Sequence, residues 1–312
     1  MIQFLGRRIL YSIVVLFLAF DPTARLAQAR DPKVRIEEKH RLGLDKPLVV
    51  QYGRWLGKFV QGDMGQTEVS REPIAGKLAQ GMSYTLQLLV WGVVVSVIAA
   101  LIIGVYSAVR QYSVGDYVLT TFSFMGISIP PFWFAFIAIQ FFVFTLPGWF
   151  GTSPWFYTFS GNLHSDGVTG FNLDYLRHLF LPVLVLTVQN IAGWSRYQRA
   201  SMLDTLNADY VRTARAKGVP RRQVIMRHAL RNALIPVVTV MALDIGLLFG
   251  GLVITEQIFS IPGMGRIFVS ALSRGDATML TAWTVVAAFF VLLFNLIADL
   301  AYGWLDPRVR IS

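Results

Sequence analysis

Long apolar runs without a charged side chain are the feature that most limits what this chain can fold into. A helix needs about 20 apolar residues to cross the roughly 30 Å hydrocarbon layer of a bilayer. Five segments meet that need: Tyr84–Val109, Tyr117–Leu146, Leu179–Ser195, Asn232–Thr255, which contains the single charge of Asp244, and Ala277–Ala298. The chain is therefore expected to be an all-α, polytopic membrane helix bundle.

The composition supports the same conclusion. Of 312 residues, 54% are hydrophobic and 15% are charged, and the mean hydropathy is +0.54. Soluble domains carry about 25% charged residues, so this chain lacks the polar surface to cover itself in water. The net charge of +10 could indicate nucleic acid. However, basic residues gather on the cytoplasmic side of membrane proteins, so we expect contact with membrane lipid and no nucleic-acid partner.

A further span near the N-terminus brings the expected number to about six. Ile9–Phe20 is apolar but would extend only about 18 Å as a helix, unless it begins earlier and Arg7 and Arg8 extend toward the interface. We divide the chain into 1–82, the first span plus an extracytoplasmic segment, and 83–312, the transmembrane domain.

The orientation follows from the basic residues. With the N-terminus inside, the short cytoplasmic segments hold fourteen Lys and Arg residues, and the short outer loops hold only Arg177, Arg266 and Arg274. Basic residues are enriched on the cytoplasmic side, so we expect a multi-pass protein of the cell membrane with both termini in the cytoplasm.

The most informative segment is polar and lies between two spans, at residues 204–231. Its sequence predicts two short helices separated by a turn at Gly218-Val219-Pro220. Gly218 stands where a helix C-terminal cap belongs, and Pro220 fits the first turn of the next helix. Asp209 is placed to stabilise the start of the first helix.

These residues also carry a family resemblance. The runs Tyr210–Gly218 and Arg227–Asn232, together with Pro262–Gly265 and Asp306-Pro307-Arg308, resemble the dipeptide/oligopeptide branch of the permease subunits of binding-protein-dependent ABC importers. The general motif of these permeases has Glu-Ala-Ala, then three further residues, then glycine. Here Arg212 and Thr213 replace its first two residues, whereas Ala214 and Gly218 match it.

The resemblance implies a type I ABC importer permease fold and a set of partners. These are a homologous second permease, one or two ABC ATPase subunits and an extracytoplasmic peptide-binding protein. The 204–231 segment would hold the helix that couples to the ATPase, with an apolar face of Tyr210, Val211 and Ala214 toward that partner. The coupling residues would be Tyr210, Val211, Arg212, Ala214, Arg215, Gly218 and Arg222. Without the resemblance, an amphipathic helix resting on anionic lipid headgroups would be favoured.

Polar and helix-breaking residues inside the spans are candidates for the transport pathway. A carboxylate at the depth of Asp244 usually faces a cavity or a partner, and a hydrogen-bonded structural role at a helix interface is an equal alternative. The same two alternatives apply to Gln189 and Asn190 in the fourth span. Pro130-Pro131 interrupts the backbone hydrogen bonds of the third span. The pair could line the gate of the pathway, or it could form a passive kink.

A Pro-Gly segment after the fifth span is a candidate for the outer mouth of the pathway. Its glycines fit a turn, and contact with a substrate-loaded binding protein is the functional alternative. The outer-mouth candidates are Glu256, Pro262, Gly263 and Gly265.

Other classes of protein fit less well. There is no cysteine, the histidines (His40, His164, His178 and His228) lack metal-ligand spacing, and Gly76-Lys77 is not part of a phosphate-binding loop. We therefore predict no metal, no cofactor and no ATPase site in this chain, and a membrane enzyme is disfavoured. A nickel or glutathione importer permease remains an alternative. So does an ion-coupled secondary transporter, which would show discontinuous helices at matching positions of two halves.

Overall fold

The computed structural model describes residues 47–68, 70–158 and 171–305. Within these ranges every regular element is a helix, and the only strand-like pairing is an isolated bridge between Gln66 and Pro73. The predicted span Ile9–Phe20 and the closing Asp306-Pro307-Arg308 lie outside the described residues. The chain forms two compact units, and the residue ranges of α4 and α14 each contribute to both. The predicted division into 1–82 and 83–312 stays a prediction.

The first unit joins the region before Leu86 to the segment 262–293. It contains α3 (Leu48–Val60), the first turns of α4 (Ile74–Val109), α13 (Met264–Arg274) and most of α14 (Ala277–Leu305). The start of α13 is held on both sides: the Met264 N–H donates to Thr85 Oγ1 at 2.8 Å, and Trp283 Nε1–H donates to the Met264 carbonyl at 2.8 Å. Helix α13 ends at Gly275, whose φ of 67° is the left-handed cap that favours glycine.

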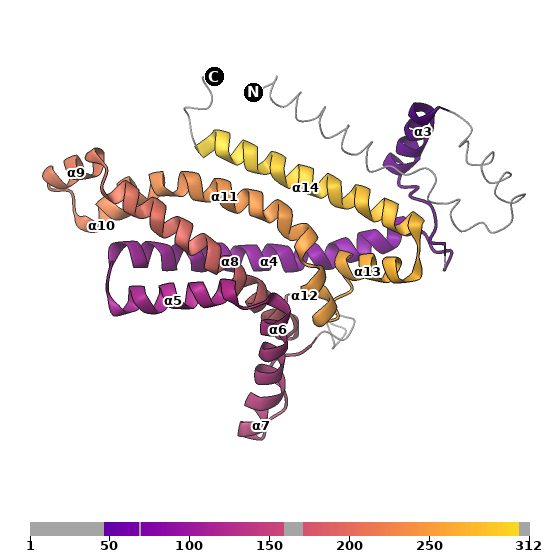
Figure 1. Cartoon of the computed structure of the whole chain (residues 1–312), viewed down its shortest axis with the longest axis horizontal. Coiled ribbons are helices and arrows are strands. Elements are labelled where there is room, and N and C mark those ends of the chain that lie inside the picture. The colour runs from indigo at the N-terminus through magenta and orange to yellow at the C-terminus, as the bar shows by residue number, and fades with distance from the viewer. Residues whose placement is uncertain (1–46, 69, 159–170, 306–312) are drawn as a thin grey trace, which may run out of the picture. The chain divides into compact units, whose positions relative to one another are not determined.

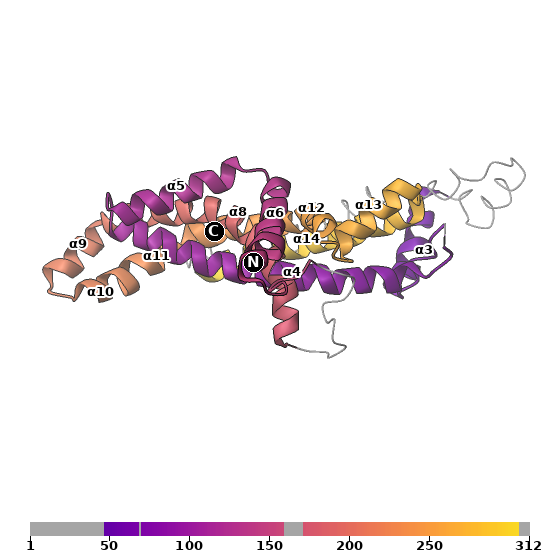
Figure 2. The same cartoon turned by 90° about the horizontal axis from the view of Figure 1, so that it is seen from below.

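The second unit contains the remaining helices, with α8 (Leu173–Leu206) at its centre. Helix α8 packs against α5, α6, α11 and α12 (Figures 1 and 2). The bounds of the other elements are α5 Val114–Ser128, α6 Pro131–Ile139, η2 Gln140–Thr145, α7 Leu146–Phe150, α9 Asp209–Ala216, α10 Arg221–Gln223, η3 Val224–Ala229, α11 Leu230–Gly251 and α12 Val253–Ile258. The turns η2 and η3 are π-helical.

Small residues allow the neighbouring helices to approach α8 closely. A Cβ added at Gly104 of α4 would lie 2.6 Å from the Gln198 side chain and 2.7 Å from the Ser195 carbonyl. At Gly126 of α5, an added Cβ would lie 3.1 Å from Ala192. Close approach at small residues is a general means of packing helices in membranes, so both contacts favour a bundle inside a bilayer.

Five of the described helices are long and apolar enough to cross a membrane, by length and composition: Ile74–Val109, Pro131–Phe150, Leu173–Leu206, Arg221–Ile245 and Ala277–Ile297. They overlap the five apolar segments of the sequence, and two of those segments need correction. The predicted Asn232–Thr255 continues past α11, which ends at Gly251, into α12. The predicted third span Tyr117–Leu146 is not a single helix, because α5 ends at Ser128 and α6 begins at Pro131. The Pro130-Pro131 pair therefore separates two helices and does not kink one.

Candidate functional site

The polar segment between α8 and α11 folds as a helix, a glycine turn and a second helix. Helix α9 ends in a Schellman motif: the Gly218 N–H donates to the Arg215 carbonyl at 3.0 Å, and the Val219 N–H donates to the Ala214 carbonyl at 3.3 Å. Gly218 has a φ of 77°. The predicted glycine cap is confirmed, and Pro220 caps the following helix one residue earlier than expected.

The inner face of α9 is packed into the chain's own core. Val211 is fully buried and Ala214 is 8% exposed. They belong to one apolar cluster with Met202 of α8 and with Val224 and Ala229 of η3. The expectation that Val211 and Ala214 present an apolar face to a partner is therefore wrong. Their three-residue spacing places both on one helix face, and that face anchors α9 to α8 and η3.

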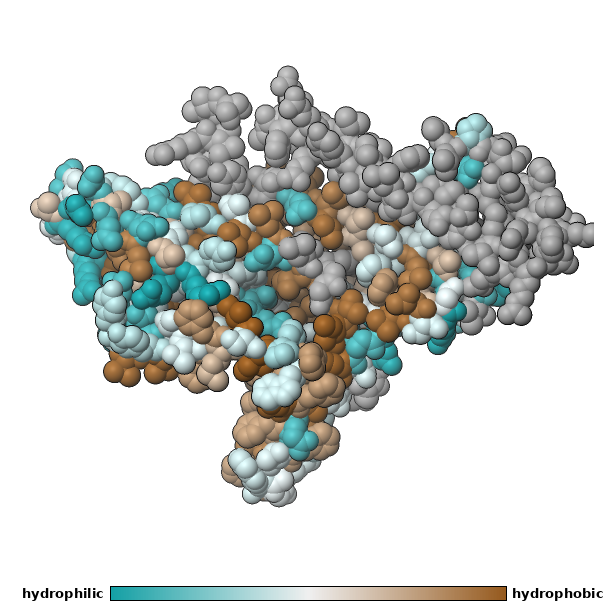
Figure 3. Space-filling model, in the orientation of Figure 1, coloured by the Kyte–Doolittle hydropathy of each residue, from teal (hydrophilic) through white to brown (hydrophobic). Residues whose placement is uncertain are grey.

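The outer face of this segment is strongly basic. Tyr210 and Met226 are its exposed apolar side chains, at 45% and 54%. Around them lie the exposed cations of what we call the basic surface: Arg212, Arg215, Lys217, Arg221, Arg222 and Arg227. Asp209 forms only an exposed ion pair with Arg212, 3.7 Å apart. Hydrophilic atoms gather over α9 and α10, in contrast to the hydrophobic atoms over α6 (Figure 3).

A buried ion pair, which the sequence analysis missed, ties the α4–α5 turn to α8. Arg199 donates to both carboxylate oxygens of Asp116, at 3.2 and 3.0 Å. Asp116 also accepts from the Tyr112 N–H at 3.0 Å and from Thr120 Oγ1 at 3.2 Å. Ser113 caps α5, and the Ser113-x-x-Asp116 spacing was the available signal for a helix start here.

The environment of Asp116 keeps its carboxylate charged. Its side chain is only 4% exposed. Burial raises its pKa, but hydrogen bonds from Arg199, from the Tyr112 N–H and from Ser107 outweigh burial and bring the pKa below its usual value. Bidentate guanidinium–carboxylate pairs fix orientation as well as distance. The pair therefore holds α5 rigidly against α8 near the end of α8 that leads into α9.

The structure gives the polar residues of the spans definite neighbours. Trp194 Nε1–H of α8 donates to an Asp244 carboxylate oxygen of α11 at 2.8 Å, and Trp194 is 2% exposed. Asn190 Nδ2 donates to Ser96 Oγ of α4 at 3.3 Å. The Gln189 amide nitrogen is buried with no hydrogen-bond partner among the described residues. Asp244 thus bonds across a helix interface, and its role in the pathway stays a prediction.

The outer-mouth candidates are mostly buried. Glu256 is fully buried, and Gly263 and Gly265 are buried too, whereas Pro262 is half-buried. The Glu256 carbonyl accepts from the Ile261 N–H at 2.9 Å in the turn that ends α12. This placement contradicts the expectation of a direct contact between the Glu256 side chain and a binding protein. Among the described residues, no group of three His, Cys, Asp or Glu side chains could hold a metal ion.

Comparison with known proteins places this helical bundle in a family. The family described as "Binding-protein-dependent transport system inner membrane component" matches residues 100–311. The chain belongs to that family, whose members are permease subunits of ABC transporters and work with other ABC subunits. It is a multi-pass membrane protein.

Individual relatives match nearly the whole chain. The oligopeptide transport system permease protein AppB of Bacillus subtilis is 39% identical, over 98% of this chain and 95% of AppB. OppB of Mycobacterium tuberculosis, an oligopeptide transport system permease protein, is 38% identical over the full length of both chains. The dipeptide transport system permease protein DppB of Escherichia coli is 34% identical over 99% of both.

A solved structure supports the fold. It is described as the crystal structure of an amino acid ABC transporter with histidines, and it matches with a TM-score of 0.53 and 12% identity. The match covers 73% of this chain and 93% of the other. The type I permease architecture expected from the sequence is therefore confirmed.

Proposed function

We propose that this chain is the permease subunit of an ATP-driven importer of dipeptides or oligopeptides. It would form half of the translocation pathway, paired with a homologous second permease. One or two ABC ATPases would bind on the cytoplasmic side, and an extracytoplasmic peptide-binding protein would deliver the cargo. Support for the peptide cargo comes from the names of relatives that match nearly the whole chain.

The observation that carries the proposal is the glycine-capped helix α9 with its basic surface turned outward. Arg212, Arg215 and Arg222 are exposed and would pair with carboxylates of the ATPase. Tyr210, 45% exposed, would supply the apolar contact at the centre. Gly218 would set the angle at which α9 meets the partner.

The way α9 is attached suits it to transmit force. Its buried face packs on α8 and η3, and η3 leads directly into α11. A displacement of α9 by a closing ATPase would therefore move α8 and α11 as packed bodies, because close-packed interfaces shift between discrete arrangements and do not deform continuously. Alternating access would follow from that movement. The chemistry of ATP hydrolysis would belong to the partner subunits.

Cysteine cross-linking tests this assignment directly, because the natural chain contains no cysteine. Single variants Arg212→Cys and Val211→Cys place a thiol on the exposed and the buried face of the same helix turn. The full complex in membranes is treated with a short heterobifunctional reagent, whose maleimide forms a thioether with the introduced thiol and whose photoreactive group then inserts into the neighbouring chain. We expect Arg212→Cys to cross-link to the ATPase, and Val211→Cys to give little product. Absence of an ATPase adduct from Arg212→Cys and from Tyr210→Cys, in a complex that still transports, would refute the docking surface.

A further inference from the structure

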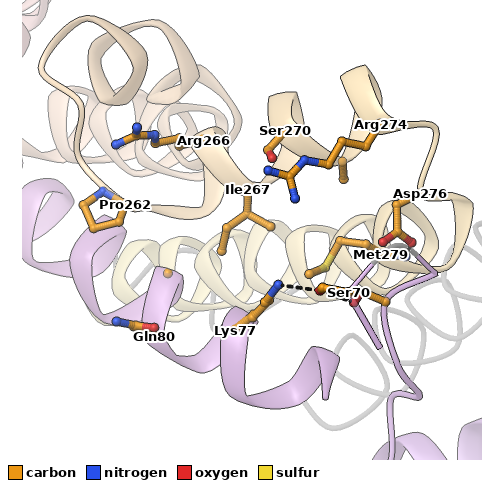
Figure 4. A pocket seen from close by; sticks show the side chains of 13 residues that line it. Ser70, Lys77, Gln80, Pro262, Arg266, Ile267, Ser270, Arg274, Asp276 and Met279 are labelled. Atoms are coloured by element: carbon orange, nitrogen blue, oxygen red, sulfur yellow. Dashed lines mark hydrogen bonds between the residues drawn. The ribbon is translucent and has the colours of Figure 1, made fainter. Parts of the chain in front are cut away.

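An open pocket in the first unit is not used by any of the roles assigned above. It lies between α13, the first turns of α4 and the loop residues 65–68 and 70–73, with a volume of about 380 Å³. Its rim carries three cations, Lys77, Arg266 and Arg274, together with Ser270 (Figure 4). Arg266, Ser270 and Arg274 are four residues apart on α13, so they share one face of that helix.

Two carboxylates near the pocket, Asp276 and Glu68, accept hydrogen bonds from backbone and hydroxyl groups. The two carboxylate oxygens of Asp276 accept from the Met279 N–H at 2.9 Å and from the Glu68 N–H at 3.1 Å. Glu68 in turn accepts from the Thr278 N–H and hydroxyl, at 3.2 and 2.6 Å. Both acids are therefore directed at the start of α14, where the helix dipole favours negative charge.

Lys77 and Arg274 differ in their ion pairs and hydrogen bonds within the chain. Lys77 pairs with Glu72 and donates to Ser70 Oγ at 3.1 Å. Arg274 is exposed and makes no hydrogen bond or ion pair with the described part of the chain. The side chains of Arg274 and Lys77 extend from α13 and α4 toward the same space (Figure 4). Glu72 lies near enough to interact with Arg274 electrostatically but is hydrogen-bonded to Lys77. The pocket thus presents an exposed guanidinium whose N–H groups are not engaged by the described part of the chain.

One wall of the pocket is preformed. In the 65–73 loop the Thr67 N–H donates to the Glu72 carbonyl, and the Ile74 N–H donates to the Gly65 carbonyl, each at 3.0 Å. The bonds between Glu68 and Thr278 fasten this loop to α14. A site whose walls are fixed in advance loses less conformational entropy when a ligand binds. The described residues of this loop, 65–68 and 70–73, are therefore held in place before a ligand binds.

The position of these cations in the sequence is also informative. In the orientation predicted from the basic residues, only Arg177, Arg266 and Arg274 lie in the short outer loops. Outer loops are normally poor in Lys and Arg. Two of these three residues, Arg266 and Arg274, line one pocket, and this grouping favours a site that binds an anion.

The lining favours a protein carboxylate over a lipid. The apolar members Ile267, Ala271 and Met279 form the packed floor, where Ile267 lies directly against Gly81. Eight of the thirteen lining residues are polar or charged: Thr67, Ser70, Lys77, Gln80, Arg266, Ser270, Arg274 and Asp276. We propose that this pocket receives an Asp or Glu side chain of the extracytoplasmic solute receptor, with Arg274 as the principal anchor; the assignment rests on the proposed function. A guanidinium binds a carboxylate through two parallel hydrogen bonds.

The test measures receptor affinity for the intact complex in nanodiscs of phosphatidylcholine, using the purified, cargo-loaded solute receptor as the probe. The variants are Arg274→Glu and Arg274→Gln, and the control is Lys58→Glu on α3, exposed but outside the pocket. We expect Arg274→Glu to weaken binding about tenfold or more and Arg274→Gln to weaken it less. Lys58→Glu should stay within about twofold of the natural chain, and added salt should weaken the natural complex more than the Arg274→Gln complex.

Co-purification of the ATPase is measured on the same preparations, because it separates the two proposals. Loss of receptor binding with the ATPase retained in Arg274→Glu supports the pocket. Unchanged receptor affinity in both Arg274 variants overturns it, as does receptor binding that requires added phosphatidylglycerol, which would mark a lipid site. A natural chain that never retains an ATPase contradicts the proposed function itself.

Discussion

Asp244 is the residue whose environment the structure changes most from the expectation of a solitary charge in a span. Its carboxylate accepts from Trp194 Nε1–H at 2.8 Å across the α8–α11 interface. Trp194 itself packs in an apolar cluster with Met241, which is 4% exposed, and Val237. A buried indole N–H left without an acceptor costs about 1–3 kcal/mol. The bond therefore contributes to the packing of α8 on α11.

Two substitutions separate the structural role of Asp244 from a role in the pathway. Asp244→Asn keeps an oxygen that can accept from Trp194, whereas Asp244→Leu removes it. We expect the Asn variant to assemble with near-natural thermal stability and the Leu variant to lose about 1–3 kcal/mol. Thermal unfolding of the detergent-solubilised complex measures both. Changed cargo transport in the stable Asn variant would place the charge on the pathway. Equal stability of the two variants would contradict the structural role of the hydrogen bond.

At the scale of helices, the sequence predicts where a helix begins and ends better than which of its faces is buried. The start, turn and cap of the 204–231 segment follow from Gly218 and Pro220, which act locally. Which face of α9 is buried depends on where α8 and η3 lie, and no local pattern contains that information. For the same reason the Arg199–Asp116 pair, which joins residues 83 positions apart, could not be foreseen, whereas the helix start at Ser113 could.

The Arg199–Asp116 pair gives a prediction about the junction of α5 and α8. Arg199→Leu leaves the buried Asp116 carboxylate unpaired and should cost about 3–5 kcal/mol. Asp116→Ala leaves the Arg199 guanidinium, which is 28% exposed and can reach water, so it should cost less. The double variant should cost less than the sum, because no charge is left unpaired. Denaturation of the purified complex gives the three values, and simple additivity would contradict a coupled pair.

The pair also predicts a dependence on pH. The folded-state pKa of Asp116 lies below its usual value of about 3.9, so the folded state favours the charged form. The stabilisation is therefore complete above the unfolded-state pKa and is lost as the pH falls through the lowered pKa of the folded state. Acid unfolding near and below pH about 4 should be less steep in Asp116→Asn. An unchanged acid transition would contradict this contribution.

At the scale of the whole molecule, the apolar runs predicted five spans that the described residues contain, and the Pro130-Pro131 break was visible as an interruption. The separation into two helices, α5 and α6, could not be predicted. A proline pair indicates where backbone hydrogen bonding stops, but it does not indicate how the two helices then pack. The family resemblance, carried by scattered short motifs, agreed with relatives that match over nearly the entire chain.

The membrane orientation is a further prediction at this scale. Fourteen basic residues against three favour both termini and the basic surface in the cytoplasm. Reporter fusions after Ala216 and after Ser312 should read as cytoplasmic, and a fusion after Ser165 should read as external. An external signal from the Ala216 fusion would place the basic surface on the wrong side for an ATPase.

The central claim is that α9 transmits the movement of an ATPase to the spans. A substitution at Gly218 tests that claim most directly. Its φ of 77° costs a residue with a Cβ about 1–2 kcal/mol, and more for a β-branched side chain, whereas Asn tolerates this conformation. No atom lies within 4 Å of an added Cβ, so the effect acts through the backbone alone.

The deciding measurement is cargo-stimulated ATP hydrolysis by the reconstituted complex, with ATPase retention followed on the same samples. We predict that Gly218→Val inserts and assembles its spans but loses most of the stimulated hydrolysis and transport, and that Gly218→Asn keeps both. Normal ATPase retention together with normal stimulated turnover in Gly218→Val would contradict the account.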